Sequence, residues 1–194
     1  MAENKVQFGL KNVHYAVLTE SANAAPSFGT PKAVPGAVTL TLAQASAETN
    51  FYADNIPYFR SSANNGYTGT LEMARFTEDM LKDIWGIEET SGSGVLSEGI
   101  DATEKPFALL FQIDGDDNDD LYVFYRCYAG RPNIGSTTIN ESGKVPQTQS
   151  CDLSVLPVID PTHGTIDGKV YAKTGESATT TVRNAWFSTV FTSL

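Results

Sequence analysis

The sequence has few of the residues on which catalytic and metal chemistry depends. It contains two histidines, His14 and His163, and two cysteines, Cys127 and Cys151. It has no H-E-x-x-H zinc helix, no C-x-x-C pair, no phosphate-binding glycine loop and no G-x-S-x-G nucleophile turn. We therefore expect no catalytic activity, no cofactor and no bound metal. A glycoside hydrolase stays open, because the distance between its paired carboxylates is not visible in a sequence.

Basic residues and long hydrophobic runs are also scarce. Thirteen Lys and Arg stand against 23 Asp and Glu, which gives a formal net charge of −10. Proteins that hold nucleic acid through its phosphates need clustered basic side chains, so this class is disfavoured. No segment approaches the length that spans a bilayer, and the N-terminus lacks the apolar run of a signal peptide. We expect synthesis in a cytoplasm, with both cysteines as free thiols on buried strand faces.

Helix patterns are almost absent, and one segment carries them. RFTEDMLKDIWG offers Thr77 as an N-cap, two acidic residues in the first turn and Gly86 as a C-terminal stop. Met80 and Ile84 fall on one face at helical spacing. These signals predict a short amphipathic helix over about residues 77–85, packed against a flat surface.

Strand patterns dominate the rest of the chain. Apolar residues alternate with threonines and other polar residues, and Gly, Pro, Asn and Asp separate the runs. The expected strands cover residues 38–42, 66–73, 107–113, 121–128, 151–158, 169–173 and 186–191. This pattern is typical of a mainly β protein, an antiparallel β-sandwich or open barrel with one flanking helix and long extended loops or arms.

The stretch FQIDGDDNDDLYVFY packs five aspartates into seven residues, which raises the question of a calcium loop. A calcium loop that begins at Asp114 has oxygen ligands at its first, third and fifth positions. Its sixth position is Asp119 instead of glycine, and its twelfth is Tyr125 instead of glutamate. Alternating apolar residues flank the stretch, so we predict a β-hairpin with a solvated turn. Weak cation binding stays open.

Three long segments fit poorly into a closed sandwich. Residues 22–36 are rich in Pro, Ala and Gly and predict an extended arm, and residues 131–149 form a long polar connection. Residues 43–65 predict a long loop with too few core residues to order itself. That loop nevertheless carries large apolar side chains, namely Phe51, Tyr52, Ile56, Tyr58 and Phe59. Apolar residues on such segments favour surfaces made for another subunit, although an ordinary loop that folds its aromatics back is the alternative.

Several phrases of the sequence together resemble the major tail proteins of long-tailed, non-contractile bacteriophages. They are FGLKNVHYAVLTE, FYADNIPYF followed by NNGYTGTLEMARFTEDMLKDIWG, KPFALLFQIDG followed by YVFYRCYAGRP, SCDLSVLPV and GKVYAKT. The resemblance runs in this order over most of the chain and weakens after about Thr174. It is one of pattern and phrase, with no catalytic signature.

The resemblance implies a tail-tube subunit, a single domain over residues 1–194 with an N-terminal arm and the long loop 43–65. Such subunits form hexameric rings that stack into the hollow tube of the virion tail, through which the genome leaves the capsid. The implied partners are copies of the chain itself, a tape measure protein, a baseplate or tail initiator and a tail terminator, with no membrane. DNA passes through the tube without specific binding.

The resemblance also assigns roles to residues. The apolar side chains Phe51, Tyr52, Ile56, Tyr58 and Phe59 would contact a neighbouring ring. Glu72 would face the lumen, where carboxylates repel phosphates over a Debye length of roughly 8 Å at physiological salt. The rival interpretation is a carbohydrate- or calcium-binding β-sandwich module that uses the aspartate-rich turn.

Overall fold

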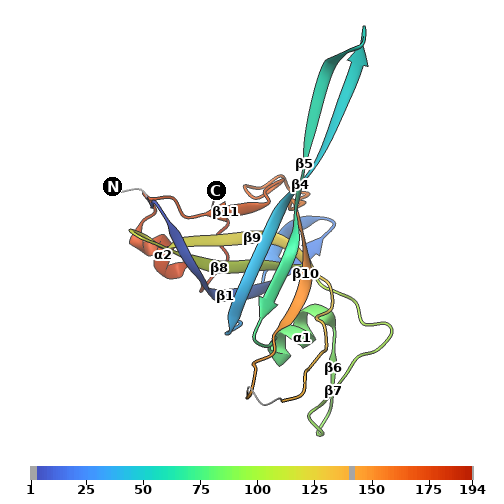
Figure 1. Ribbon diagram of the computed structural model, residues 1–194, viewed down its shortest axis with the longest axis vertical. Coiled ribbons are helices and arrows are strands. Elements are labelled where there is room, and N and C mark those ends of the chain that lie inside the picture. Colours follow the sequence, from blue (N-terminus) through green and yellow to red (C-terminus); the bar gives the residue numbers. More distant parts are fainter. Residues whose placement is uncertain (1–3, 140–142, 194) are drawn as a thin grey trace.

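The computed structural model of the chain describes residues 4–139 and 143–193. Figure 1 shows a curved antiparallel sheet with a long two-stranded hairpin projecting from it. Within the described residues the sheet has nine strands, and its main path runs β2-β1-β8-β9-β10-β5-β4. The strands on this path are β1 (Gln7–Ser21), β2 (Ala24–Phe28), β4 (Ala37–Ala53), β5 (Ile56–Met73), β8 (Phe107–Gly115), β9 (Asp120–Ala129) and β10 (Gln149–Leu156). The predicted mainly β fold is confirmed.

Four short strands complete the β structure of the described residues. β3 (Lys32–Ala33) pairs with β1, and β11 (Tyr171–Lys173) pairs with β9. β6 (Glu88–Thr90) and β7 (Val95–Ser97) form a small separate hairpin. The path starts with β2 and β1 and ends with β4. The sheet curls so that β1 and β4 lie near each other, but no ladder of hydrogen bonds joins them. The sheet is therefore an open barrel.

The aspartate-rich stretch forms the predicted turn between paired strands. β8 and β9 are antiparallel, with Ile113 opposite Asp120 at the end of their ladder. β8 is buried on both faces: Leu109 points to one core cluster and Leu110 to the other. This strand is the centre of the molecule, which explains its continuous run of apolar residues.

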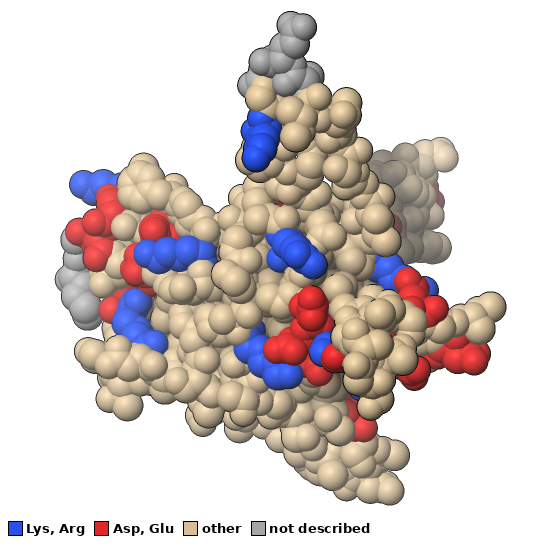
Figure 2. Space-filling view, turned by 90° about the horizontal axis from the view of Figure 1, so that it is seen from below, with Lys and Arg blue, Asp and Glu red and all other residues tan. Residues whose placement is uncertain are grey.

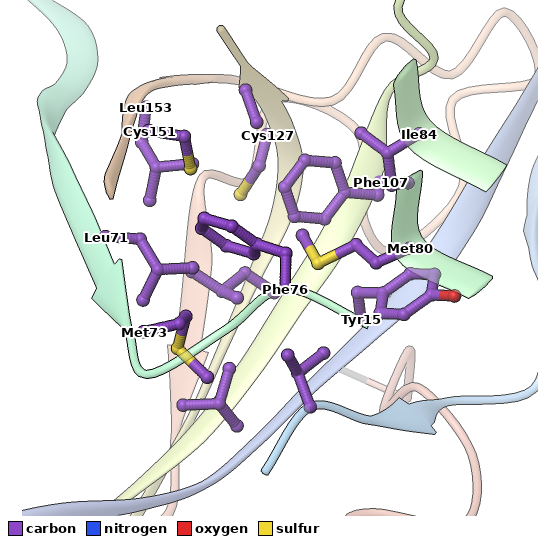
Figure 3. Close-up of a cluster of buried hydrophobic side chains, with 14 of the residues drawn as sticks. Tyr15, Leu71, Met73, Phe76, Met80, Ile84, Phe107, Cys127, Cys151 and Leu153 are labelled. Atoms are coloured by element: carbon purple, nitrogen blue, oxygen red, sulfur yellow. The ribbon is translucent and has the colours of Figure 1, made fainter. Parts of the chain in front are cut away.

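The first helix matches its prediction. α1 (Glu78–Trp85) begins after Thr77, whose hydroxyl accepts a hydrogen bond from the backbone N–H of Met80. It ends at Gly86, which has a φ of 67°. Met80 and Ile84 are fully buried, and Figure 3 shows both side chains directed toward Phe107. α1 thus closes one side of the main core, where both cysteine thiols are also buried and free.

The C-terminal prediction is wrong. Residues 186–191 were expected to form a strand, but they follow a second helix, α2 (Thr180–Ala185), and continue in turns. Trp186 is 3 % exposed and packs into the second core cluster on the opposite face of the sheet. Val182 and Val190 pack there as well, four residues before and after Trp186. This helical spacing outweighs the strand propensity of the threonines and valines.

Three expected appendages are also corrected. Residues 22–36 do not form a free arm: β2 and β3 fold back onto β1, and Val34 is buried. At the N-terminus, β1 begins at Gln7 and pairs with β8, so it belongs to the sheet. Residues 43–65 form a regular antiparallel hairpin instead of a loop, because the ladder of β4 and β5 continues to its tip. None of the helices in the described part of the chain has the length and apolar character that crossing a bilayer requires.

Candidate functional site

The β4–β5 hairpin leaves the body of the protein at a bulge. The ladder shifts register between Gln44 and Ser46, where β5 carries one residue more than β4. Gly66 lies at this shift with a φ of 86°, and a Cβ there would lie 1.9 Å from the carbonyl oxygen of Val155 in β10. Only glycine fits this position. The bulge bends the ribbon away from the sheet.

The tip of the hairpin is a tight two-residue turn. Asp54 and Asn55 connect Ala53 to its partner Ile56, and both turn residues have positive φ, 54° and 64°. Two successive positive φ values are the geometry of a type I′ turn, which matches the twist of the flanking strands. The β4 side of the ribbon runs from Ser46 to Ala53, which is eight residues. At about 3.3 Å per residue, the ribbon projects roughly 25 Å from the bulge.

The five apolar residues that were expected to contact another subunit all lie at the tip of the hairpin. Figure 1 shows that the tip stands far from the rest of the chain. Every one of the five side chains is more than half exposed: Phe51 59 %, Tyr52 61 %, Ile56 58 %, Tyr58 73 % and Phe59 61 %. A contiguous apolar cluster this exposed is typical of a surface that another molecule covers.

The tip is apolar on both faces of the ribbon. Phe51 lies directly opposite Phe59, so these two rings share one face. Tyr52 is the next residue along β4, which carries no extra residue at the register shift between Phe51 and Tyr52, so alternation directs its side chain to the other face. On that face, just below the tip, Arg60 forms an ion pair with Glu48. A ribbon with apolar side chains on both faces can be fully covered only between two surfaces.

The aspartate-rich turn is held by donors from the N-terminal segment. Lys11 lies 2.8 Å from a carboxylate oxygen of Asp114, and this hydrogen bond raises the pKa of Lys11 above its ordinary value. The backbone N–H of Lys5 donates to Asp116 over 2.9 Å. Further donors to the turn are the side chains of Asn4, Gln7, Gln112 and Lys173. Within residues 4–139 and 143–193, no group of three or more His, Cys, Asp or Glu side chains is arranged to hold a metal ion.

Glu72, the residue expected to face a lumen, lies on the outer face of the sheet. Its neighbours in β5, Leu71 and Met73, are buried in the core, so alternation directs Glu72 to the opposite side. Its carboxylate accepts a hydrogen bond from the hydroxyl of Thr148. The same outer face carries the exposed Asp152 on the neighbouring strand β10.

A second group of exposed apolar residues was missed by the sequence interpretation. These residues lie on the β6–β7 hairpin, which Figure 1 places at the end of the long axis opposite the tip, and in the coil of residues 98–106, 130–139 and 143–148. Ile100 and Ile134 are almost fully exposed, at 99 % and 96 %. Figure 2 views the molecule from this end, where acidic and basic side chains lie next to one another in small groups separated by uncharged surface. A single isoleucine in a polar coil segment shows no helical or strand periodicity. The sequence therefore carries no signal that these residues are exposed, and the structure was needed to find them.

The two histidines lie in local structural contacts. The ring of His14 stacks on Phe187 with 4.7 Å between centroids. His163 pairs with Asp167 over 2.8 Å, and this hydrogen bond raises the pKa of His163 above its ordinary value.

A scan against protein-family models and a search of curated proteins found no match to this chain.

Proposed function

We propose that this chain is a virion structural protein that polymerises into the tube of a long, non-contractile bacteriophage tail. The observation that carries the proposal is the projecting hairpin, whose tip exposes five large apolar side chains roughly 25 Å from its root. A lone subunit would leave this surface in water. A neighbouring copy that covers it gains apolar burial, the main favourable contribution to association.

The distribution of exposed apolar residues supports head-to-tail contacts. The aromatic tip lies at one end of the long axis, and the β6–β7 hairpin, which carries the exposed Val95, lies at the other end. Contact between two different surfaces of identical subunits does not close a dimer, and it generates rings or extended polymers instead. Stacked rings, hexameric by the resemblance of the sequence, use both ends of every subunit.

The free strand edges support lateral contacts within a ring. Among the described residues β4 pairs only with β5, so its outer edge offers unpaired backbone groups. Exposed edges of this length invite pairing with another chain. Pairing of a neighbouring copy along such an edge would give these backbone groups their missing partners.

The negative charge fits a conduit that does not retain its cargo. A net charge of −10 in a 194-residue chain opposes the attachment of DNA phosphates. Basic side chains along the bore would instead produce salt-dependent binding of the duplex. Glu72 and Asp152, which share the outer face of β5 and β10, are the carboxylates that we assign to the bore.

Negative-stain electron microscopy of the purified chain tests this proposal. We expect rings or tubes of uniform width, formed at high protein concentration or after addition of a tail initiator complex. A chain that remains monomeric under both conditions contradicts the proposal.

Calorimetry with calcium separates the proposal from the rival binding module. The carboxylates of the aspartate-rich turn are engaged by protein donors such as Lys11. We therefore expect no tight, stoichiometric heat of calcium binding. A submicromolar, one-to-one response would favour the rival.

A further inference from the structure

An aromatic groove lies where the open barrel fails to close. It has a volume of about 410 Å³ and lies between β1 and β4, with Leu40 and Leu42 of β4 on one wall. Its floor is a series of rings from β8 and β9. Phe111 stacks on Tyr122 with 5.2 Å between centroids and an interplanar angle of 6°, and it lies 5.9 Å from Phe124 at 9°. The volume falls within the roughly 300–1,000 Å³ of small binding pockets, so the groove admits a few side chains.

The rim of the groove is apolar and exposed. Phe8 of β1 is 55 % exposed and Tyr171 of β11 is 43 % exposed, and both line the opening. Gln7 is the one polar side chain among the lining residues apart from the tyrosine hydroxyls. A sugar would require several polar side chains around such rings, so this lining favours apolar or aromatic side chains as the occupant.

Unpaired strand edges flank the groove. Among the described residues, the outer edge of β1 has no strand partner from Gln7 to Asn12, and that of β4 has none along its length. An extended segment that enters the groove meets backbone donors and acceptors at its sides and aromatic rings beneath it. This combination is the arrangement by which open sheets accept an added strand.

The tip of the β4–β5 hairpin has the properties that the groove requires. It is already extended, and both outer edges of the ribbon are free of backbone partners within the described residues. It carries Phe51 and Phe59 on one face and Tyr52 on the other, so it needs burial on both sides. In Figure 1 the tip points away from its own sheet, so a groove that receives it must belong to another copy.

We infer that the aromatic groove between β1 and β4 receives the hairpin tip of a second copy of this chain. The inference rests on the proposed function and names the receiving surface for the tip. Rings such as Phe59 and Tyr58 then pack against the Phe111–Tyr122–Phe124 floor, where aromatic pairs add to the energy of burial. The groove is therefore the surface that we assign to the tip.

Disulfide trapping between two differently substituted chains tests the inference. One chain carries Tyr58→Cys at the tip, and the second carries Phe8→Cys at the groove rim. The native thiols do not interfere, because burial raises the pKa of Cys127 and raises that of Cys151 to about 12. After mild oxidation of the mixture we expect a covalent dimer. The matched control replaces the second chain by Ile134→Cys, an exposed coil position that does not line the groove.

The outcomes separate this inference from the proposed function. The inference predicts about tenfold or more cross-linked dimer with Phe8→Cys than with Ile134→Cys. An equal or larger yield with Ile134→Cys overturns it. If microscopy of the same chains shows tubes and the Phe8→Cys pair stays uncross-linked, the groove is excluded while the proposed function stands. If neither tubes nor cross-links form, both fail.

A second test measures self-association without cross-linking, so it does not depend on the two introduced cysteines lying close enough to form a disulfide. Phe8→Ser removes an apolar rim residue, and Ile159→Ser removes a similarly exposed side chain that does not line the groove. We expect Phe8→Ser to weaken self-association about tenfold or more in sedimentation velocity, as for a buried anchor residue. Ile159→Ser should leave it unchanged. Equal association of the two variants would contradict the inference.

Discussion

Asp83 ties three separate elements of the protein together. It lies on α1 and accepts a hydrogen bond from the Tyr15 hydroxyl of β1 over 2.8 Å. The ammonium of Lys32 in β3 lies 2.6 Å from the same carboxylate. Tyr15 itself is 1 % exposed, so its hydroxyl has little access to water if this acceptor is lost. A single carboxylate thus fixes the helix against the sheet.

We predict that Asp83→Ala lowers the free energy of unfolding by about 1–3 kcal/mol at pH 7, the usual cost of leaving a buried donor without its partner. Urea denaturation followed by circular dichroism measures the change. Asp101→Ala, which removes an exposed carboxylate from coil, is the control and should change stability little. A loss in Asp83→Ala no larger than in this control would show that the contact adds nothing.

The same contact predicts a pH dependence. Partial burial raises the pKa of Asp83, but the hydrogen bonds from Lys32 and Tyr15 outweigh this effect and hold the pKa below its ordinary value. A carboxyl group whose pKa is lowered by folding stabilises the protein above its unfolded pKa, and this contribution disappears as the pH falls through the folded pKa. The stability difference between wild type and Asp83→Ala should therefore shrink in acid.

At the scale of elements, the hairpin is separable from the core. All residues from Ser46 to Asn64 are exposed except Ala53, which is half-buried. We predict that replacing this segment with Asn-Gly changes the free energy of unfolding by less than about 1 kcal/mol, because no core side chain is removed. The same variant should lose assembly in microscopy. Denaturation and microscopy of one preparation measure both effects.

The result that would contradict this prediction is a shortened chain that still forms tubes. A matched control keeps the ribbon and changes its apolar tip: Tyr58→Ser with Phe59→Ser. Since the control retains the full ladder, a loss of assembly in both variants assigns the effect to the apolar side chains. A loss in the shortened chain alone would assign it to the length of the ribbon.

Predictability from sequence differed between elements for physical reasons. α1 carries its own caps and a clear apolar face, and β8 and β9 are runs of apolar and aromatic residues on either side of a turn, so local patterns located them. α2 is six residues long, and its strongest signal, the spacing of Val182, Trp186 and Val190, extends past its end. The apolar tip residues were identifiable because they stood in polar sequence. The groove was not, since Phe8, Leu42 and Phe111 meet only after the sheet curls.

At the scale of the whole molecule, the charge balance makes a functional prediction. We predict that Glu72→Lys with Asp152→Lys leaves tubes intact but slows genome release from virions, because cations in the bore hold DNA phosphates. Release triggered in vitro and followed by the fluorescence of a DNA-binding dye measures the rate. The delay should shrink as salt concentration rises.

The control for this prediction makes the same change of charge elsewhere. Asp101→Lys with Glu104→Lys changes two exposed carboxylates in the segment before β8, outside the strands β5 and β10 that carry Glu72 and Asp152. It should not alter release. Wild-type release from virions that carry Glu72→Lys and Asp152→Lys would show that these two carboxylates do not line the bore.

The bulge at Gly66 has a mechanical consequence. Beyond it the ribbon is held by its ladder hydrogen bonds and the ion pair between Arg60 and Glu48, and an isolated two-stranded ribbon is only marginally stable. Such a ribbon flexes about its root while the body stays unchanged. If subunits join through such ribbons, we expect elastic joints, so that a filament built from them would absorb curvature at every level and bend over long distances without losing a contact.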